Sequence, residues 1–135
     1  MKELTLEATL DNLSEVLGFV DSFLEENYCS TKAQMQIDVA VEEIFVNIAS
    51  YAYAPNTGNA TIKLDRIANS PMVTIILEDE GVPYDPLAKA DPDITLPADE
   101  RQIGGLGIYM VKKSMDSMEY ERSNGKNILT LTKKI

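Results

Sequence analysis

The sequence feature that most constrains the fold is the stretch at 41–53, VEEIFVNIASYAY, which has the pattern of a helix with two polar side chains beside its apolar face. Glu43 and Asn47 are four residues apart, so a helix stacks them one turn above the other. The neighbouring apolar face is formed by Ile37, Val41, Ile44 and Ile48. A helix of this kind either exposes a polar edge to solvent or holds a ligand.

The rest of the chain alternates between strand-like and helix-like patterns in an order typical of an α+β domain. Ser30 and Thr31 supply an N-cap for the long helix, and a turn-rich run at 55–59 ends it. The predicted elements, in order, are a strand at 2–9, a helix from Asp11 or Asn12 to about residue 27, the long helix at 32–54, a hairpin of strands at 60–67 and 72–78, a helix at 108–117, and a hairpin of strands at 118–122 and 128–133 around Asn124-Gly125.

The composition excludes several classes of protein. With 135 residues, 44% of them hydrophobic and 25% charged, the chain has the size and make-up of one ordinary globular domain. It has no apolar run of the ~20 residues that a membrane helix needs and no signal-peptide pattern, so we expect a cytoplasmic protein with no membrane partner. The lack of histidine and the single Cys29 argue against zinc, a histidine base and an internal disulfide. A net charge of −10 argues against nucleic acid as a partner.

Residues 80–103 differ from the rest because they are rich in proline and acidic side chains and have neither a strand nor a helix period. An irregular segment of more than ~15 residues inside a compact domain is usually functional or disordered. We interpret 82–103 as a lid over a site. A surface loop without a task is the alternative.

Asp79 and Gly81 follow a strongly apolar strand. A carboxylate at the end of a strand can accept a hydrogen bond from an exocyclic amine, and a glycine beside it lets the chain approach a flat ring closely. The alternative is an ordinary turn that ends the strand, for which Asp and Gly are common residues.

Gly104-Gly105-Leu106-Gly107 opens the third helix. Glycines before a helix N-terminus expose N–H donors, and the helix dipole adds partial positive charge, so the pattern suits a phosphate group. It matches neither the P-loop nor the dinucleotide-binding fingerprint. A flexible hinge is the alternative.

Together with Glu43 and Asn47, these motifs follow one another in an order that suits ATP and Mg²⁺. Asn47 offers a carbonyl oxygen as a single protein ligand for Mg²⁺, and Glu43 is placed to orient or deprotonate an attacking hydroxyl. Taken alone, the pair is more simply explained as two side chains that cap or solvate the edge of an amphipathic helix. The full set provides a metal ligand, an amine acceptor, a cover and a phosphate cradle with few cationic side chains, which agrees with the net charge of −10.

The three motifs resemble those of the GHKL (histidine kinase-like) superfamily of ATP-binding domains, and closely its anti-sigma-factor serine/threonine kinase branch, over nearly the whole chain. Glu42-Glu43-x-x-x-Asn47 is similar to the N-box, DEGVPYDP at 79–86 to the G1 box, and GGLGIYMV at 104–111 to the G2 box. The resemblance implies one domain over 1–135 with a two-layer α/β sandwich of the GHKL (Bergerat) type. Its sheet is expected to be mixed and mostly antiparallel, with three helices on one face.

The resemblance also implies roles for single residues. Glu43 is expected to be the general base and Asn47 the Mg²⁺ ligand. Asp79 is expected to accept the adenine amino group, with Gly81 beside the ring. The nucleotide phosphates are expected to lie against the second box, at Gly104, Gly105, Leu106 and Gly107.

The chain departs from the family pattern at two places. Tyr51 stands in a region where many relatives carry a histidine. Near the C-terminus, Gly125-Lys126-Asn127 stands where others have Gly-Thr, so Asn127 or Thr130 is expected to supply a polar contact to the nucleotide site. The cations nearest to the second box in the sequence are Arg101, Lys112 and Lys113.

Members of the branch bind a sigma factor, hold it inactive, and phosphorylate a serine or threonine of a small anti-sigma-factor antagonist. The resemblance therefore implies a Mg²⁺-dependent serine/threonine kinase that regulates transcription through these two partners, and dimers are common among the relatives. A nucleotide-gated protein-binding module of the same fold, without kinase activity, is the first alternative. A structural interaction domain without a ligand is the second.

Overall fold

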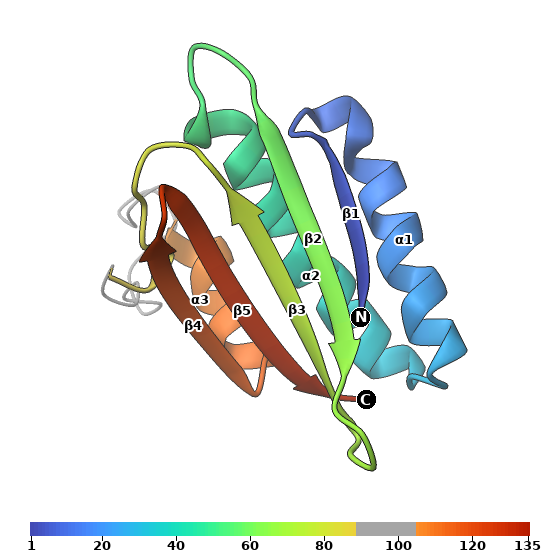
Figure 1. Ribbon diagram of the computed structural model, residues 1–135. Coiled ribbons are helices and arrows are strands. Elements are labelled where there is room, and N and C mark those ends of the chain that lie inside the picture. The colour runs from blue at the N-terminus through green and yellow to red at the C-terminus, as the bar shows by residue number, and fades with distance from the viewer. Residues whose placement is uncertain (89–104) are drawn as a thin grey trace.

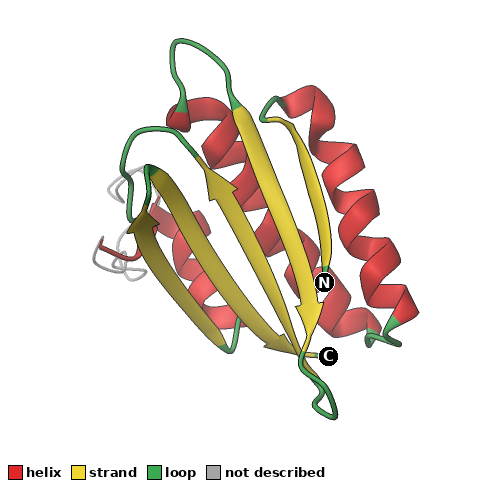
Figure 2. Ribbon diagram, viewed as in Figure 1, coloured by secondary structure: helices red, strands yellow, loops and turns green. Residues whose placement is uncertain are grey.

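The computed structural model describes residues 1–88 and 105–135, which form a sheet covered on one face by helices (Figures 1 and 2). This α+β arrangement confirms the fold class expected from the sequence. The helices are α1 (Leu13–Glu26), α2 (Thr31–Asn47) and α3 (Gly105–Ser114). The strands are β1 (Lys2–Glu7), β2 (Asn59–Arg66), β3 (Met72–Asp79), β4 (Ser117–Ser123) and β5 (Lys126–Lys134).

The five described strands form one sheet in the order β1-β2-β3-β5-β4, and all four of its strand pairings are antiparallel. The sheet of the described residues is therefore not mixed, as the resemblance implied, but wholly antiparallel. β5 lies between β3 and β4, so residues of the last hairpin lie beside the middle of the chain (Figure 1). Asn124 and Gly125 form the turn of this hairpin with φ values of 52° and 78°. These left-handed conformations are the ones that a two-residue hairpin turn requires, and Asn and Gly adopt them readily.

The core lies between the sheet and the helices because successive side chains of a strand point to opposite faces. On β2 and β3, the buried side chains follow this alternation, at Ala60, Ile62, Leu64, Val73, Ile75 and Leu77. The helices bury apolar stripes of period 3 to 4 against them, and the buried side chains of α2 include Ile37, Val41, Ile44 and Phe45. β3 continues its alternation to its last residue, so Asp79 also faces the helices.

Helix α2 begins where the sequence predicts, since the Ser30 hydroxyl accepts a hydrogen bond from the backbone N–H of Ala33 at 3.2 Å. Its regular part ends at Asn47 and is followed by a π-helical turn over Ile48–Ala52. π-turns within helices occur frequently at functional sites. Asn47 therefore stands at the change from regular to wide helix, rather than in the middle of one long helix as predicted.

The predicted lid at 82–103 lies only partly within the described residues. Its first seven residues are described and include a short 3₁₀ turn at Pro86–Ala88. Residues 89–103 and Gly104 lie outside the described residues. Across 1–88 and 105–135, no helix combines the length and the apolar character needed to cross a bilayer.

Candidate nucleotide-binding site

A cavity of about 400 Å³ lies between the helices and the ends of β3 and β5. This volume is within the ~300–1,000 Å³ typical of sites for small ligands. Its apolar walls come from three helical segments and two strands, with Ile44, Ile48, Ile108, Leu77 and Leu129 among the lining residues. Two amides and one carboxylate also line it, from Asn47, Asn127 and Asp79, together with three tyrosines.

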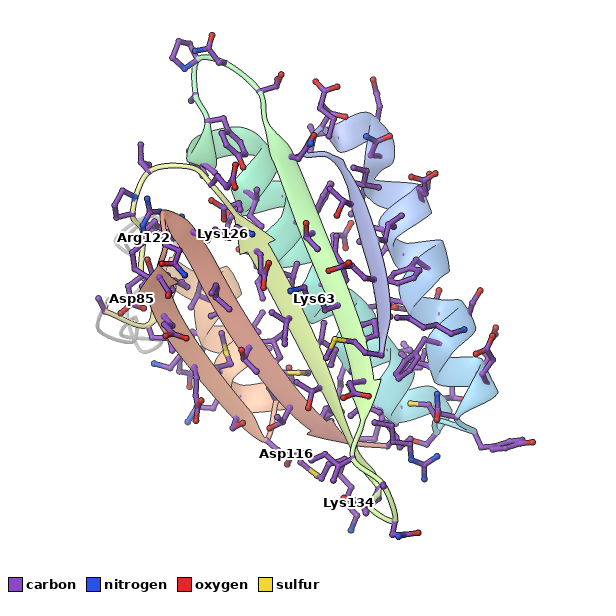
Figure 3. The ribbon with its side chains drawn as sticks, viewed as in Figure 1. Lys63, Asp85, Asp116, Arg122, Lys126 and Lys134 are labelled. Atoms are coloured by element: carbon purple, nitrogen blue, oxygen red, sulfur yellow. The ribbon has the colours of Figure 1, made fainter. Side chains whose placement is uncertain are left out.

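Asp79 is the last residue of β3, and its carboxylate side chain is buried, with only 7% of the residue's surface exposed. Its Oδ1 atom accepts hydrogen bonds from the backbone N–H of Gly81 and from Nδ2 of Asn127, both at 2.9 Å. Within the described part of the chain, Oδ2 accepts none. Successive side chains of a strand point to opposite faces of the sheet, so the carboxylate of the preceding residue, Glu78, lies on the other face. There it forms an ion pair with Lys63 at 3.0 Å (Lys63 is labelled in Figure 3).

Asn127 is the residue of β5 that pairs with Asp79, and it is buried to the same extent. Its Nδ2 also donates to the Val82 carbonyl oxygen at 2.8 Å. Its Oδ1 accepts from the Tyr120 hydroxyl at 2.5 Å and from the Tyr84 backbone N–H at 3.3 Å. A single amide thus connects β3, β4 and the first residues of the predicted lid.

Gly81 lies against the π-helical turn at the end of α2. A Cβ atom at this position would overlap the carbonyl oxygen of Ala52, which also accepts the Val82 backbone N–H at 2.9 Å. The clash would be with backbone, which cannot move aside as a side chain can. Glycine is therefore required here by the close approach of two chain segments, which differs from the approach to a flat ring that the sequence pattern suggested.

The Tyr53 hydroxyl closes the same corner of the site. It donates to the Asn59 carbonyl oxygen at 2.6 Å and accepts the Glu80 backbone N–H at 2.7 Å. The pKa of this hydroxyl is raised, mainly by burial and also by the charges of Asp79 and Glu80. The hydrogen bond from the Glu80 backbone N–H lowers the pKa only in part. The hydroxyl therefore stays protonated at neutral pH, as its donor role requires.

At the helical end of the cavity, the Nδ2 of Asn47 donates a long hydrogen bond of 3.4 Å to Oε1 of Glu43. The two half-buried side chains make no other hydrogen bond within the described residues. The Glu43 carboxylate lies against Gly107 in the first turn of α3, so closely that a Cβ at Gly107 would overlap it. The start of α3 thus meets the predicted catalytic pair, with Ile108 lining the cavity one residue further along.

The structure brings Asn47 and Asp79 to one cavity, with Glu43 and Gly107 in contact at its helical end. Gly81 does not line the cavity itself but lies against Ala52, which does. Gly105 and Leu106 are the first residues of α3, and Gly104 lies outside the described residues. Lys112 and Lys113 belong to the last turn of α3, away from its start, and Lys113 lies over the Tyr109 ring.

The structure does not bring Thr130 to the cavity. On β5 the buried residues are Asn127, Leu129 and Leu131, so Thr130 between them points to the opposite face of the sheet. The alternation of apolar and polar residues at 129–132 carried this information, and it favours Asn127 over Thr130. Of the two alternatives left open by the sequence, the structure places Asn127 beside Asp79.

Sequence reasoning missed three residues around the site. Tyr120 faces the cavity from β4, Tyr53 fastens Glu80, and the Arg122 guanidinium donates to the Gly81 carbonyl oxygen at 2.8 Å. Strand alternation on β4 gives a signal for Tyr120. The other two bond to backbone atoms far away in the sequence, and no local pattern indicates such contacts.

The residues present fit a nucleotide with a metal ion. A carboxylate oxygen of the buried Asp79 that accepts no hydrogen bond from the described residues suits an exocyclic amine, and an apolar cavity suits a flat ring. Oδ1 of Asn47 accepts no hydrogen bond from the described residues, and one amide oxygen is a suitable contribution to Mg²⁺, which takes most of its ligands from phosphate and water.

Comparisons with known proteins agree with this geometry. The sequence matches the family model of the histidine kinase-like ATPase domain over residues 6–133. It is 27% identical over 129 residues to the serine/threonine-protein kinase BtrW of Bordetella bronchiseptica, an alignment that covers 96% of this chain and 90% of that protein. It is 25% identical over 128 residues to the serine-protein kinase RsbW of Bacillus cereus, covering 92% of this chain and 72% of the relative. RsbW of Bacillus thuringiensis matches to the same extent.

Proposed function

Because the chain belongs to the histidine kinase-like ATPase domain family, we propose that it is an ATP- and Mg²⁺-dependent protein serine/threonine kinase that regulates a sigma factor. The observation that carries the proposal is the pairing of two unlike polar sites in one cavity. Asp79 is a base-recognition group on the sheet, while Glu43 and Asn47 form a reactive pair on α2 beside the start of α3. Relatives over nearly the full chain are named as serine or serine/threonine kinases.

Adenine binding is assigned to the sheet end of the cavity. Oδ2 of Asp79 would accept a hydrogen bond from the adenine amino group, because its Oδ1 is already bonded to Gly81 and Asn127. The apolar side chains of Ile48 and Leu77 would contact the ring. Burial from water strengthens the bond between the amine and a charged acceptor.

Phosphoryl transfer is assigned to the helical end. The Oδ1 of Asn47 would hold Mg²⁺, which supplies neutralisation of the phosphate charge. A serine or threonine hydroxyl of the protein substrate attacks the γ-phosphorus of ATP, the bond to the β-phosphate oxygen breaks, and ADP leaves. Glu43 takes the proton of the attacking hydroxyl, a role for which its carboxylate has capacity left after its one long bond to Asn47.

The partners follow from the resemblance to the anti-sigma branch. The protein substrate is proposed to be a small anti-sigma-factor antagonist, and a sigma factor is the regulated partner, with a homodimer as the assembly to test. The cytoplasm is the compartment that holds ATP, sigma factors and antagonists together. The glycines of the second box, from Gly104 to Gly107, are proposed to contact the phosphates from the start of α3.

A nucleotide-gated binding module without transfer activity is the second candidate. The observation that favours it is that Val82, Pro83 and Tyr84, the first residues of the predicted lid, line the cavity. A nucleotide would therefore contact the start of the lid, and binding alone would change the surface offered to a protein partner.

The two candidates are separated by phosphoryl transfer from labelled ATP to an anti-sigma-factor antagonist protein. We expect wild-type protein to label the antagonist, and Glu43→Gln to lower the rate by about 10²–10⁴-fold with ATP affinity kept, because a general base typically contributes that factor. Glu42→Gln is the matched control, since Glu42 is an exposed neighbour on the same helix. Equal rates for wild type and Glu43→Gln would contradict the kinase assignment of Glu43.

A further inference from the structure

The Asn127 amide uses its full hydrogen-bonding capacity within the protein. An asparagine side chain has two N–H donors and two acceptor lone pairs. Both donors are occupied, by Oδ1 of Asp79 and the carbonyl oxygen of Val82. Both lone pairs are occupied as well, by the Tyr120 hydroxyl and the Tyr84 backbone N–H. The side chain lines the cavity but has no donor or acceptor left for a ligand.

These four partners also determine the orientation of the amide. Rotating it by half a turn would place its oxygen against the Asp79 carboxylate and the Val82 carbonyl, and its NH₂ group against the Tyr84 N–H. Each of these pairs would be two acceptors or two donors in contact inside a buried site, which is costly. The orientation is therefore unique, and it holds Oδ1 of Asp79 in one place.

From this geometry we infer that Asn127 is a positioning residue that sets the base selectivity of the nucleotide site by fixing the Asp79 carboxylate, and that it fastens 82–84 to the sheet. The inference rests on the proposed nucleotide function. With Oδ1 held by Gly81 and Asn127, Oδ2 is the only oxygen of Asp79 that can meet the base. A base with an amino group at this point donates to it, whereas a base with a carbonyl group places acceptor against acceptor.

Selectivity of this kind requires a carboxylate that cannot turn away. If the Asp79 side chain rotated freely, its carboxylate could turn away from the carbonyl group of a mismatched base, or a water molecule could enter between the two acceptors. The free-energy penalty for binding the wrong base would then be smaller. The second bond to Asp79 Oδ1, from the Gly81 N–H, comes from the same short turn and moves with it. Asn127 is therefore the only side chain among the described residues that ties the carboxylate to another strand.

The attachment of 82–84 has support from a neighbouring contact. Arg122, two residues from Tyr120 on β4, donates to the Gly81 carbonyl oxygen at 2.8 Å. Figure 3 shows Arg122 and Lys126 close together at the end of the β4–β5 hairpin, where β3 also ends. Two side chains, Arg122 and Asn127, thus attach the chain leaving β3 to the last hairpin. The carbonyl oxygen of Ala52 attaches it to the π-helical turn that follows α2.

The test compares the affinities of the protein for ATP and for inosine triphosphate, which carries a carbonyl where ATP carries the amino group. We expect wild type to prefer ATP, and Asn127→Ala to reduce the ratio of the two affinities by about tenfold, the worth of one well-placed hydrogen bond. Tyr120→Phe keeps the ring and removes one partner of the amide, so a smaller decrease of the same ratio is expected. Thr74→Val, an isosteric change on the outer face of β3, should leave the ratio unchanged.

The ratio separates positioning from a general structural role. A fold that is only weakened lowers both affinities by the same factor and leaves the ratio at its wild-type value, and that result for Asn127→Ala would overturn the inference. Wild-type protein that binds neither nucleotide would contradict the proposed function itself, and with it the role in selectivity.

Hydrogen exchange of the Tyr84 backbone N–H tests the attachment of 82–84 without any nucleotide. We expect protection in the wild type and in Thr74→Val, and faster exchange in Asn127→Ala. An exchange rate that Asn127→Ala leaves unchanged would overturn this part of the inference.

Discussion

The two ends of the cavity differ in how the protein treats its own polar groups. At the sheet end, Asp79 and Asn127 are almost fully buried and bonded to each other and to nearby backbone. At the helical end, Glu43 and Asn47 are half-buried and share one hydrogen bond of 3.4 Å. At the sheet end, other groups of the protein hold the polar side chains in place. At the helical end, Glu43 and Asn47 keep most of their hydrogen-bonding capacity.

This difference matches two different tasks. Recognition of a base benefits from acceptors that are fixed before the ligand arrives, because little ordering then remains to be done on binding. Chemistry on a phosphate needs groups that can still bind a metal ion or accept a proton. Stability and activity should therefore respond to different substitutions at the two ends.

Two glycines give the sharpest test of this contrast. A Cβ at Gly107 would meet the Glu43 carboxylate, the far end of a flexible side chain, whereas a Cβ at Gly81 would meet the Ala52 backbone. We expect Gly107→Ala to reduce phosphoryl transfer by about 100-fold or more through displacement of Glu43, with little change in stability. We expect Gly81→Ala to lower the free energy of unfolding by about 1–3 kcal/mol through overpacking.

Urea unfolding and phosphoryl transfer measured on both variants decide the matter. We expect Gly107→Ala to lose mainly phosphoryl transfer and Gly81→Ala to lose mainly stability. Each variant therefore serves as the control for the other. If Gly107→Ala destabilised the protein as much as Gly81→Ala, the helical end would be as rigidly packed as the sheet end, and the contrast between them would be wrong.

Between α1 and α2 lies a carboxyl group that extends the comparison, because its neighbour is another carboxyl group. Asp38 faces Asp21, and an oxygen of each is buried without a hydrogen-bond partner among the described residues. Burial, followed by the hydrogen bond and charge of Asp21 and the charge of Glu42, raises the pKa of Asp38 from 3.8 to about 7. The folded state therefore binds a proton that the unfolded chain releases near pH 4.

The sign of the pH effect follows from this shift. The stabilisation from protonated Asp38 is complete below about pH 4 and is lost as the pH rises through about 7. Asp38→Asn, which cannot ionise, should raise the free energy of unfolding relative to wild type more at pH 8 than at pH 5. We expect a difference of about 1 kcal/mol after allowance for screening at this partly exposed site.

Urea unfolding at the two pH values measures this difference. Glu25→Gln, an exposed position on α1, is the matched control and should show the same change at both. The same change at pH 5 and pH 8 for Asp38→Asn would mean that Asp38 does not titrate between them in the folded protein.

Local patterns were sufficient for most of the fold. The Ser30 cap, the Asn124-Gly125 turn and the alternation on β3 are each determined by neighbours in the sequence, and all are present. The helical spacing of Glu43 and Asn47 likewise predicted that they would lie one turn apart.

Contacts between segments that are distant in the sequence could not be predicted from local patterns. That Asn127 pairs with Asp79 depends on the register between β3 and β5, 48 positions apart in the chain. That Gly107 lies against Glu43 depends on how α3 packs on α2. Thr130 was a different kind of error, because its neighbours Leu129 and Leu131 already indicated that it points outward.

The division of the cavity into a base end and a phosphate end is tested most directly by ATP affinity with and without Mg²⁺. We predict that Asp79→Asn weakens binding by about 10–100-fold in both conditions, since it disturbs a hydrogen bond to a charged group. Asn47→Ala should weaken binding only when Mg²⁺ is present, and Thr130→Val in neither condition. Undiminished binding by Asp79→Asn, or a loss in Asn47→Ala that persists without Mg²⁺, would contradict this division.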